Sequence, residues 1–302
     1  MKGKLSDYSK IGLVHHMIYP ECMTDQDAHV RTLIELSQRE DIETFDCCIP
    51  FGEERREQLI SHLTQIRKEI IYALHLYPLR KIALASSSPH DQEISRMIVR
   101  DQIEMAAAIG ATGFIFASGP DFPEERESAK RRFSEFTSWF CKQLNNRSMI
   151  GLLEPFDREI DKKFLLGPSE ECAEFVQSLR HSGIDNLFIE LDMAHVPLMG
   201  ESFTHAIHQL SPYLKRVHLG NCILKDKQHV WYGDYHPPIG YQGGEIDTPE
   251  LAGILQELLS VGYLSKKERG ALILEMVPYP GQTSAYTIED NFQRLEDAWK
   301  LV

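Results

Sequence analysis

Four side chains able to do chemistry stand at the ends of apolar segments in the second half of the chain. They are Glu154 in MIGLLEPF, Asp192 in NLFIELDMAH, His218 in LKRVHLG and Glu275 in ALILEMV. One buried acid or histidine is most often a satisfied core group. Three acids and a histidine at the ends of consecutive segments, however, cannot all stay charged unless a cation compensates them. Carboxylate and imidazole ligands without thiolate suit Mn²⁺, Co²⁺, Mg²⁺ or Zn²⁺. The pattern therefore predicts one divalent metal ion held by these four residues.

The elements that position these residues alternate between short strands and longer amphipathic helices. The strands are expected at 11–19, 44–50, 70–78, 112–119, 149–156, 186–195, 214–220 and 271–277. The helices are expected at 25–40, 54–67, 91–109, 124–145, 169–181, 202–210, 248–260 and 286–300. Such alternation predicts an α/β fold, a closed (β/α)8 TIM barrel formed by a single domain over 1–302. An open doubly wound sheet is disfavoured because no G-x-G-x-x-G follows the first strand.

In such a barrel, a polar residue at the carboxyl end of a strand faces the mouth where substrates bind. Asp192 and His195 are expected at that mouth. Glu190, two residues earlier on the same face, is expected one layer deeper and needs an internal partner. The connection over 221–247 is unusually long, which is typical of a functional loop or a lid.

Composition narrows the class of protein. Lys and Arg number 32 against 45 Asp and Glu, a formal charge of −13 that disfavours nucleic acid as a partner. Six cysteines form no C-x-x-C pair, which indicates reduced thiols. The polar amino terminus and the lack of an 18-residue apolar run predict a cytoplasmic protein that neither enters nor crosses a membrane. Trp139 and Phe140 could form an exposed face for a homo-oligomer.

The chain resembles the xylose isomerase-like barrel superfamily, which includes sugar isomerases, ketose 3-epimerases, inosose dehydratases, hydroxypyruvate isomerase and endonuclease IV-type abasic-site nucleases. The resemblance covers essentially the whole chain. It is carried most specifically by LEPFDR at 153, LDMAH at 191, VHLGN at 217, GGEID at 243 and LILEMV at 272. It implies the same metal ligands, Glu154, Asp192, His218 and Glu275.

The resemblance also implies roles in catalysis. The two glutamates would act as paired acid and base on a bound sugar, and removal of a proton next to a carbonyl would give an enediolate that a metal ion stabilises. His195 and Arg158 match substrate-binding residues, and His75 either contacts a sugar hydroxyl or is a structural barrel histidine. Ile160 replaces a further substrate-binding glutamate of the epimerases, so the substrate is expected to differ from their ketohexoses.

Two other readings concern the long loop and the reaction. Asp234 and His236 form a D-x-H pair that, with His195, matches a zinc site of the nucleases; otherwise they contact sugar hydroxyls or order a lid. His75 matches a further nuclease ligand, but the fourth strand lacks the histidine that those enzymes need. The favoured function is therefore a metal-dependent isomerase or epimerase of a small sugar or sugar derivative. A keto-sugar dehydratase or decarboxylase is the main alternative, an abasic-site nuclease is less favoured, and a binding protein without activity would not need such a costly cluster.

Overall fold

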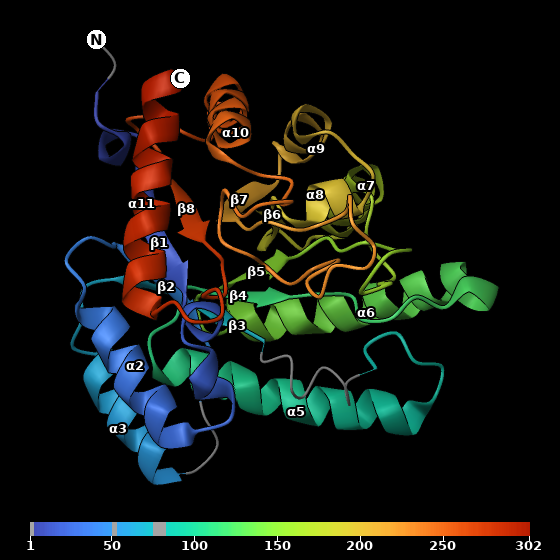
Figure 1. Cartoon of the computed structure of the whole chain (residues 1–302). Helices are drawn as coiled ribbons and strands as arrows, with labels where there is room; N and C mark the ends of the chain where they lie inside the picture. The colour runs from blue at the N-terminus through green and yellow to red at the C-terminus, as the bar shows by residue number, and fades with distance from the viewer. Residues whose placement is uncertain (1–2, 50–52, 75–82) are drawn as a thin grey trace.

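Eight parallel strands close into a barrel in sequence order, which confirms the predicted (β/α)8 architecture (Figure 1). The computed structural model describes residues 3–49, 53–74 and 83–302. The strands are β1 Ser9–Val14, β2 Thr44–Cys47, β3 Glu69–Ala73, β4 Gly113–Phe116, β5 Ile150–Leu153, β6 Leu187–Asp192, β7 Leu214–Leu219 and β8 Gly270–Leu274. Pairing of β1 with β8 completes the ring, so the described strands leave no open sheet edge.

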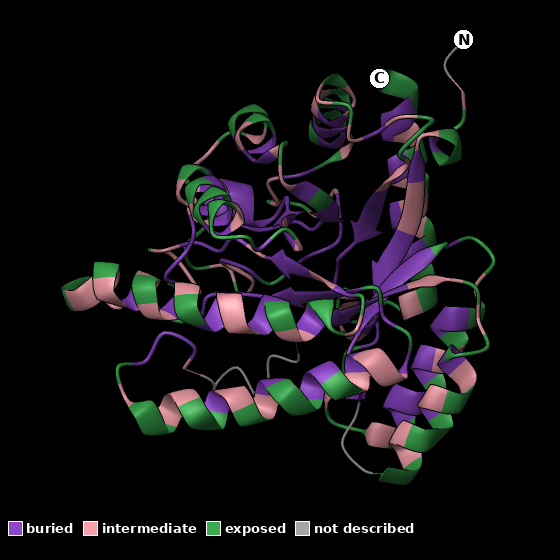
Figure 2. Ribbon diagram, turned by 180° about the vertical axis from the view of Figure 1, so that it is seen from behind, coloured by how far each residue is buried: buried purple, intermediate pink, exposed green. Residues whose placement is uncertain are grey.

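Helices cover the outside of this ring and expose mainly their outer faces (Figure 2). They are α1 His15–Ile18, α2 Gln26–Gln38, α3 Glu53–Leu63, α5 Pro89–Ala108, α6 Arg126–Asn145, α7 Ser169–His181, α8 His195–Leu198, α9 Phe203–Leu210, α10 Thr248–Ser260 and α11 Ser284–Leu301. Short 3-10 turns stand at η1 Leu5–Asp7, η2 Pro20–Met23 and η3 Pro123–Glu125. Side chains cap several helix starts: Asp25, Ser88 and Asp247 accept backbone N–H groups of α2, α5 and α10.

The inside of the barrel has an apolar part and a charged part. Alternate residues of each strand point inward, and two small apolar clusters fill part of that space: Val14, Ala271 and Ile273, and Ile71, Ile115 and Leu152. Strands β2, β6 and β7 instead send buried charged or polar groups inward: Asp46, Glu190, Asp192, Arg216 and His218. Burial of this many charges is costly unless they are paired with one another or with a bound ion.

A β-bulge sets the pairing of these charges. The register between β6 and β7 shifts between Ile189 and Glu190, and beyond the shift Glu190 lies opposite Arg216 and Asp192 lies opposite His218. A bulge adds one residue to one strand and re-aims the side chains that follow. Each acid of β6 therefore has a basic neighbour on β7.

One sequence expectation about the surface is wrong. Phe140 is buried, with its ring centroid 4.6 Å from that of Phe116, so it forms no exposed face. Trp139 is half-buried under the guanidinium of Arg96, 5.9 Å from the ring centroid. The reason is helical geometry, because consecutive residues of α6 point about 100° apart and Phe140 lies on the side that packs on the barrel.

Among the described residues, no helix is both long and apolar enough to cross a membrane. The six cysteines are all free and buried, in line with the expectation of reduced thiols.

Candidate active site

The four predicted metal ligands all lie at the carboxyl end of the barrel. Asp192 is the last residue of β6 and His218 is the last but one of β7, whereas Glu154 and Glu275 directly follow β5 and β8. A cavity of about 120 Å³ opens there, and its polar lining consists of His16, Glu154, Lys162, His195, His218, Asp234, His236 and Glu275. We call this space the mouth cavity.

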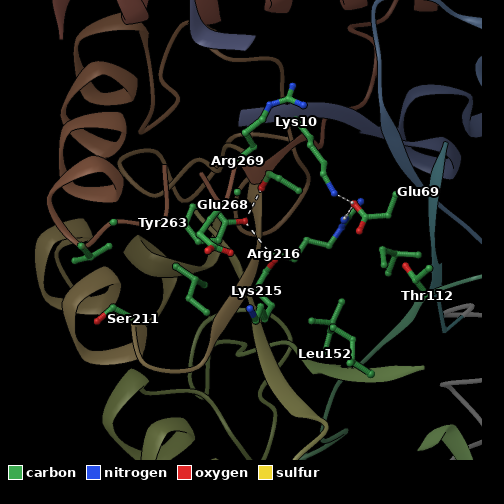
Figure 3. A pocket seen from close by; sticks show the side chains of 17 residues that line it. Lys10, Glu69, Thr112, Leu152, Ser211, Lys215, Arg216, Tyr263, Glu268 and Arg269 are labelled. Carbon is green, nitrogen blue, oxygen red and sulfur yellow. Dashed lines mark hydrogen bonds and ion pairs between the residues drawn. The ribbon is translucent and has the colours of Figure 1, made fainter. Parts of the chain in front are cut away.

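A larger cavity, about 440 Å³, lies at the opposite end of the barrel (Figure 3). Part of its charged lining is paired within the protein: Lys10 lies 3.4 Å from Glu69, and Arg269 donates to Glu43. Barrel enzymes bind substrates at the carboxyl ends of the strands. The smaller mouth cavity is therefore the candidate site.

His218 is held between carboxylates. Its Nε2 lies 2.6 Å from Asp46 Oδ2, and its Nδ1 lies 2.5 Å from Glu275 Oε2. Because an ionised carboxylate only accepts hydrogen bonds, Nε2 carries a proton that it donates to Asp46. Burial alone would lower the pKa of His218, but Glu190 and Glu275 raise it well above its ordinary value. Nδ1 is then the nitrogen that holds either a proton or a cation, an arrangement common among metal-binding histidines.

Arg216 in turn fixes Asp46. Its Nε donates to Asp46 Oδ2 over 2.9 Å, and its Nη2 donates to Asp46 Oδ1 and to Thr44 Oγ1. All three side chains are buried. This bidentate pair fixes the direction of the Asp46 carboxylate, so that the ring of His218 is fixed as well.

Glu190 is fully buried, and neither of its oxygens accepts a hydrogen bond from the described residues. The nearest basic atom is His218 Nδ1, 3.5 Å from Oε1, which supplies the internal partner that the sequence could not name. Burial raises the pKa of Glu190 well above its ordinary value. One atom from each of Glu154, Glu190 and His218 that could bind a metal ion lies within 4.8 Å of the other two.

Asp192 uses its two oxygens differently. Oδ1 accepts from the N–H of Ala194 at 2.9 Å and of Gly220 at 3.1 Å, whereas Oδ2 accepts no hydrogen bond. Oδ2 instead lies 3.4 Å from His195 Nε2 and 3.7 Å from His236 Nδ1. The carboxylate is thus locked in direction with one oxygen free.

The long connection after β7 brings a second set of donors to Asp192. Donor atoms of Asp192, His195, Asp234 and His236 lie within 4.8 Å of one another, and this buried group could hold a metal ion. His195 Nδ1 donates to Pro155 O at 2.9 Å, which leaves Nε2 facing Asp234 Oδ2 at 3.3 Å. His236 Nε2 lies 2.8 Å from Asp234 Oδ1.

His236 reaches this position with a left-handed backbone, φ 50°, and its carbonyl accepts the N–H of Val277 at 2.8 Å. A non-glycine residue in that region is strained, and such strain is often found at functional sites. The hydrogen bond from Val277, in the segment after β8, keeps the backbone of His236 in this conformation.

The side-chain ammonium of Lys162 places one positive charge at the mouth cavity. Its Nζ lies 2.9 Å from Asp234 Oδ2 and 2.9 Å from Asp161 Oδ2. The carboxylate of Asp157 accepts the backbone N–H groups of Ile160, Asp161 and Lys162, which fixes this loop. Sequence reasoning did not identify Lys162.

Glu154 and Glu275 line the same cavity in different electrostatic surroundings. Burial raises the pKa of Glu154 to about 8. Burial would raise the pKa of Glu275 too, but the positive charges of His236 and His218 lower it to about 2. The two carboxyl groups therefore differ strongly in proton affinity, a feature often seen in acid and base pairs.

Arg158 does not reach the mouth cavity. Its guanidinium forms a bidentate pair with Glu171 at 2.7 and 2.8 Å and donates to Leu165 O at 2.7 Å. It links the loop after β5 to α7, a structural use that the prediction of substrate contact did not include. His75, the other predicted substrate contact, lies outside the described residues.

Sequence reasoning also missed Asp46 and His16. His16 follows β1 with the same inward parity as Val14, and burial lowers its pKa to about 4. An acid inside the apolar run TFDCC was a usable signal for Asp46, because a buried strand carries a charge only where it is paired.

The mouth fits a divalent cation. Both carboxyl oxygens of Glu190 and Oδ2 of Asp192 are buried without a hydrogen-bond donor among the described residues, and unpaired buried polar groups are strongly unfavourable. The surrounding donor set contains only carboxylate oxygen and imidazole nitrogen, which matches the predicted choice of ions.

Fold and site together define a (β/α)8 barrel with an acidic, imidazole-rich mouth. The chain belongs to the xylose isomerase-like TIM barrel family, whose model matches residues 34–297. This confirms the resemblance inferred from the motifs.

Solved structures of the same fold span almost the whole chain. A D-tagatose 3-epimerase-like protein is 17% identical, with a TM-score of 0.71, over 96% of this chain and 98% of that one. An AP endonuclease, family 2, from Brucella melitensis is 17% identical, with a TM-score of 0.67, over 92% and 96%. A D-psicose 3-epimerase is 15% identical, with a TM-score of 0.66, over 97% of each chain. A search of curated protein sequences finds no match.

Proposed function

We propose that this protein is a divalent-metal-dependent isomerase or epimerase that acts on a small sugar or sugar derivative through an enediolate. One observation carries the proposal: Glu154 and Glu275 line a single cavity beside His218 Nδ1 and the free Oδ2 of Asp192. Two carboxyl groups at one small cavity can remove a proton from a carbon and return one to it.

The protein's residues divide the work as follows. Glu154, Asp192, His218 and Glu275 hold the cation, which, when bound, polarises the substrate carbonyl and stabilises negative charge as a Lewis acid. Glu154 and Glu275 take and return the proton next to the carbonyl. Burial would lower the pKa of His195, but the carboxylates of Asp234 and Asp192 raise it well above its ordinary value, so Nε2 carries a proton as well as Nδ1. His195 Nε2 and Lys162 Nζ, both at the mouth cavity, donate hydrogen bonds to substrate hydroxyls.

Dehydration or decarboxylation of a keto-sugar passes through a similar anion and would use the same residues. Abasic-site cleavage is less favoured for two reasons. Ile115, Phe116 and Ala117, the residues of β4 and its end that line the cavity, include no histidine for the further ligand that those nucleases need, and a charge of −13 opposes binding to duplex DNA. The D-tagatose, D-psicose and L-ribulose 3-epimerases among the similar folds support sugar chemistry as the first choice.

The test uses protein loaded with Mn²⁺, Co²⁺, Mg²⁺ or Zn²⁺, incubated with a panel of ketoses and separately with an abasic duplex. We expect epimerised or isomerised sugar and no strand cleavage. Glu154→Gln and Glu275→Gln should each lower kcat by about 10²–10⁴-fold without unfolding the barrel. Strand cleavage without sugar turnover would replace the proposal by the nuclease alternative, and full activity in either variant would remove the acid and base assignment.

A further inference from the structure

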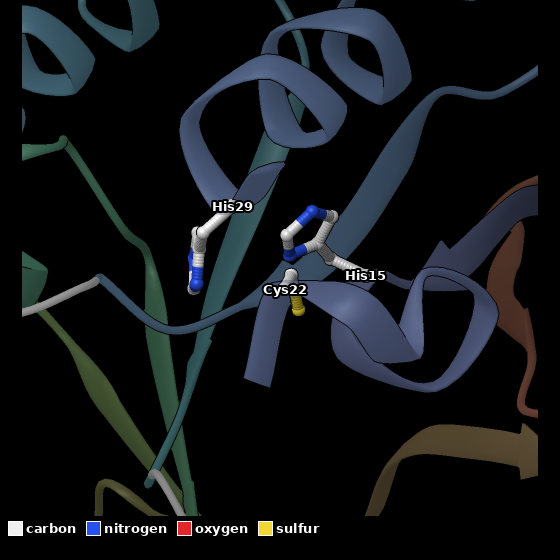
Figure 4. A group of neighbouring side chains, drawn as sticks. All are labelled: His15, Cys22 and His29. Carbon is white, nitrogen blue, oxygen red and sulfur yellow. The ribbon is translucent and has the colours of Figure 1, made fainter. Parts of the chain in front are cut away.

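Three metal-binding side chains gather outside the barrel, between β1 and α2. His15 begins α1, Cys22 lies in η2 and His29 lies in α2, and one donor atom from each lies within 4.8 Å of the others (Figure 4). All three are buried, with 0%, 4% and 1% of their surface exposed. None of them lines the mouth cavity, so this group is separate from the candidate active site.

The hydrogen bonds of His15 leave one nitrogen facing this group. Thr32 Oγ1 donates its only hydrogen to Ala28 O at 2.8 Å, so it accepts from His15 Nε2 at 2.8 Å. Nε2 then carries the proton, and Nδ1 keeps a lone pair. That Nδ1 is buried and has no hydrogen-bond partner among the described residues. Figure 4 shows it on the side of the ring that faces Cys22.

His29 is fixed in a similar way. Its Nε2 donates to the carbonyl of Cys48 at 2.9 Å, because a carbonyl oxygen can only accept. Its ring centroid lies 4.8 Å from that of His15. Burial lowers the pKa of both histidines, although hydrogen bonding of His29 with the backbone of Cys48 and Cys22 opposes the effect, so both rings are neutral in the free protein. A neutral imidazole keeps a lone pair on one ring nitrogen. Neutral imidazole is the form that binds metal ions.

Cys22 adds a sulfur ligand. Burial raises the pKa of its thiol to about 12, so the free protein holds it protonated, and a cation bound here would displace that proton. Two imidazoles and one thiolate suit Zn²⁺ among common divalent ions, whereas Mg²⁺ and Ca²⁺ prefer oxygen ligands. Zinc bonds of about 2.0–2.3 Å place tetrahedral ligands roughly 3.3–3.8 Å apart, so ligand atoms that lie within 4.8 Å of one another need to approach by at most about 1.5 Å.

We propose that His15, Cys22 and His29 form a structural binding site for a zinc-class divalent cation. The three ligands come from three successive elements of the first β/α unit, so the ion would tie η2 and α2 to the end of β1. Residue 16, next to His15, lines the mouth cavity. The ion would therefore fix the backbone that presents His16, whatever reaction the mouth performs.

The experiment titrates the full-length, reduced protein with Co²⁺ alone and follows absorption. Thiolate bound to cobalt gives a charge-transfer band that carboxylate and imidazole ligands do not, so the band is specific to a site that contains cysteine. We expect the band in the unaltered protein and its loss in Cys22→Ser. Two matched variants should keep the band. They are Cys141→Ser, in α6, and Cys222→Ser, whose thiol is buried near Asp234 of the mouth.

Zinc content and thermal stability give independent readouts. The unaltered protein should bind one equivalent of Zn²⁺ more than Cys22→Ser, and Zn²⁺ should raise its Tm more. His29→Gln keeps a side-chain N–H for the carbonyl of Cys48 but loses the lone pair, so it should also lose that equivalent. The metal-free Tm and circular dichroism of each variant check that it is folded.

A band that persists in Cys22→Ser, or cobalt binding without any band in the unaltered protein, would overturn the site. Sugar turnover does not enter either readout, so failure here and failure of the proposed enzymatic function are distinguishable.

Discussion

At the scale of single residues, the direction of a carboxylate matters as much as its presence. Both backbone N–H groups that hold Asp192 act on Oδ1, and Oδ2 is thereby left to the mouth. Gly220 allows this arrangement because a Cβ at that position would lie 2.5 Å from Asp192 Oδ1 and 2.7 Å from His236 Nδ1. Two candidate ligands thus pack directly on a residue without a side chain.

Gly220→Ala should therefore weaken metal binding. The added methyl displaces Asp192 and His236, and disturbed support of a ligand typically costs about 10–100-fold in metal affinity or activity. Calorimetric titration with Mn²⁺ and the rate of sugar turnover measure the effect. Gly253→Ala is the matched control, since a Cβ there meets no atom within 4 Å. It lies in α10 and should leave affinity unchanged and stabilise the protein by about 0.5–1 kcal/mol. Equal affinities in the two variants would contradict this account of Asp192.

We expect the ammonium of Lys162 to limit the number of metal ions that bind at the mouth. Its ammonium lies 2.9 Å from Asp234, where it compensates a carboxylate that would otherwise be free for a second ion. Lys162→Met keeps the aliphatic stem and removes the charge, so we expect one further equivalent of bound Mn²⁺ or Zn²⁺. Elemental analysis after dialysis counts the ions. Lys225→Met removes the charge of an exposed lysine that pairs with Glu245 and should leave the count unchanged. An unchanged count in Lys162→Met would show that its ammonium does not occupy the place of an ion.

At the scale of elements, loops after the strands are anchored to the helices around them. Arg158, in the loop after β5, is paired with Glu171 in the first turn of α7. Hydrogen bonds from Arg158, and from Lys130 whose Nζ lies 2.7 Å from Glu171 Oε2, lower the pKa of Glu171 to about 2. A carboxyl group whose folded pKa is depressed stabilises the protein above its ordinary pKa, and that stability is lost as pH falls through the folded value.

Stability should therefore fall between about pH 4.5 and pH 2 through this pair. Because the pair is partly exposed and screened, we expect a contribution on the order of 1 kcal/mol. Urea unfolding of the unaltered protein and of Glu171→Gln across this range should show the difference shrinking towards low pH. Arg158→Met should lower stability similarly and leave the KM for sugar unchanged. A raised KM with unchanged stability would return Arg158 to the substrate-binding role that the sequence suggested.

Element by element, the sequence predicted what local patterns determine. Short apolar segments with polar ends predicted the strands, and amphipathic segments between them predicted the helices. Contacts between distant parts of the chain were not predictable in this way. Asp46 meets His218 across 172 positions, and the β6–β7 bulge that aligns Glu190 with Arg216 has no local signature. Lys162 was hidden for the same reason, because its partner Asp234 is contributed by another loop.

At the scale of the whole molecule, the barrel concentrates buried acids at one end. Five carboxylates face the mouth or the layer beneath it: Glu154, Glu190, Asp192, Asp234 and Glu275. The fold brings them together although burying them is unfavourable, so a bound cation should repay part of that cost. A cation that binds only the folded state stabilises it by mass action.

Removal of the metal should consequently lower the melting temperature. At a free ion concentration about 100 times the Kd, binding contributes roughly 2.7 kcal/mol. For a chain of this size, that corresponds to a shift on the order of 4 °C. Differential scanning calorimetry with Mn²⁺ and with excess chelator measures the shift. Asp192→Asn and His218→Gln should abolish it, because each removes one ligand from the mouth, whereas Cys22→Ser should keep the response to Mn²⁺, since thiolate is a poor ligand for that ion. A melting temperature that does not respond to Mn²⁺ in the unaltered protein would mean that the acids at the mouth are compensated without an ion.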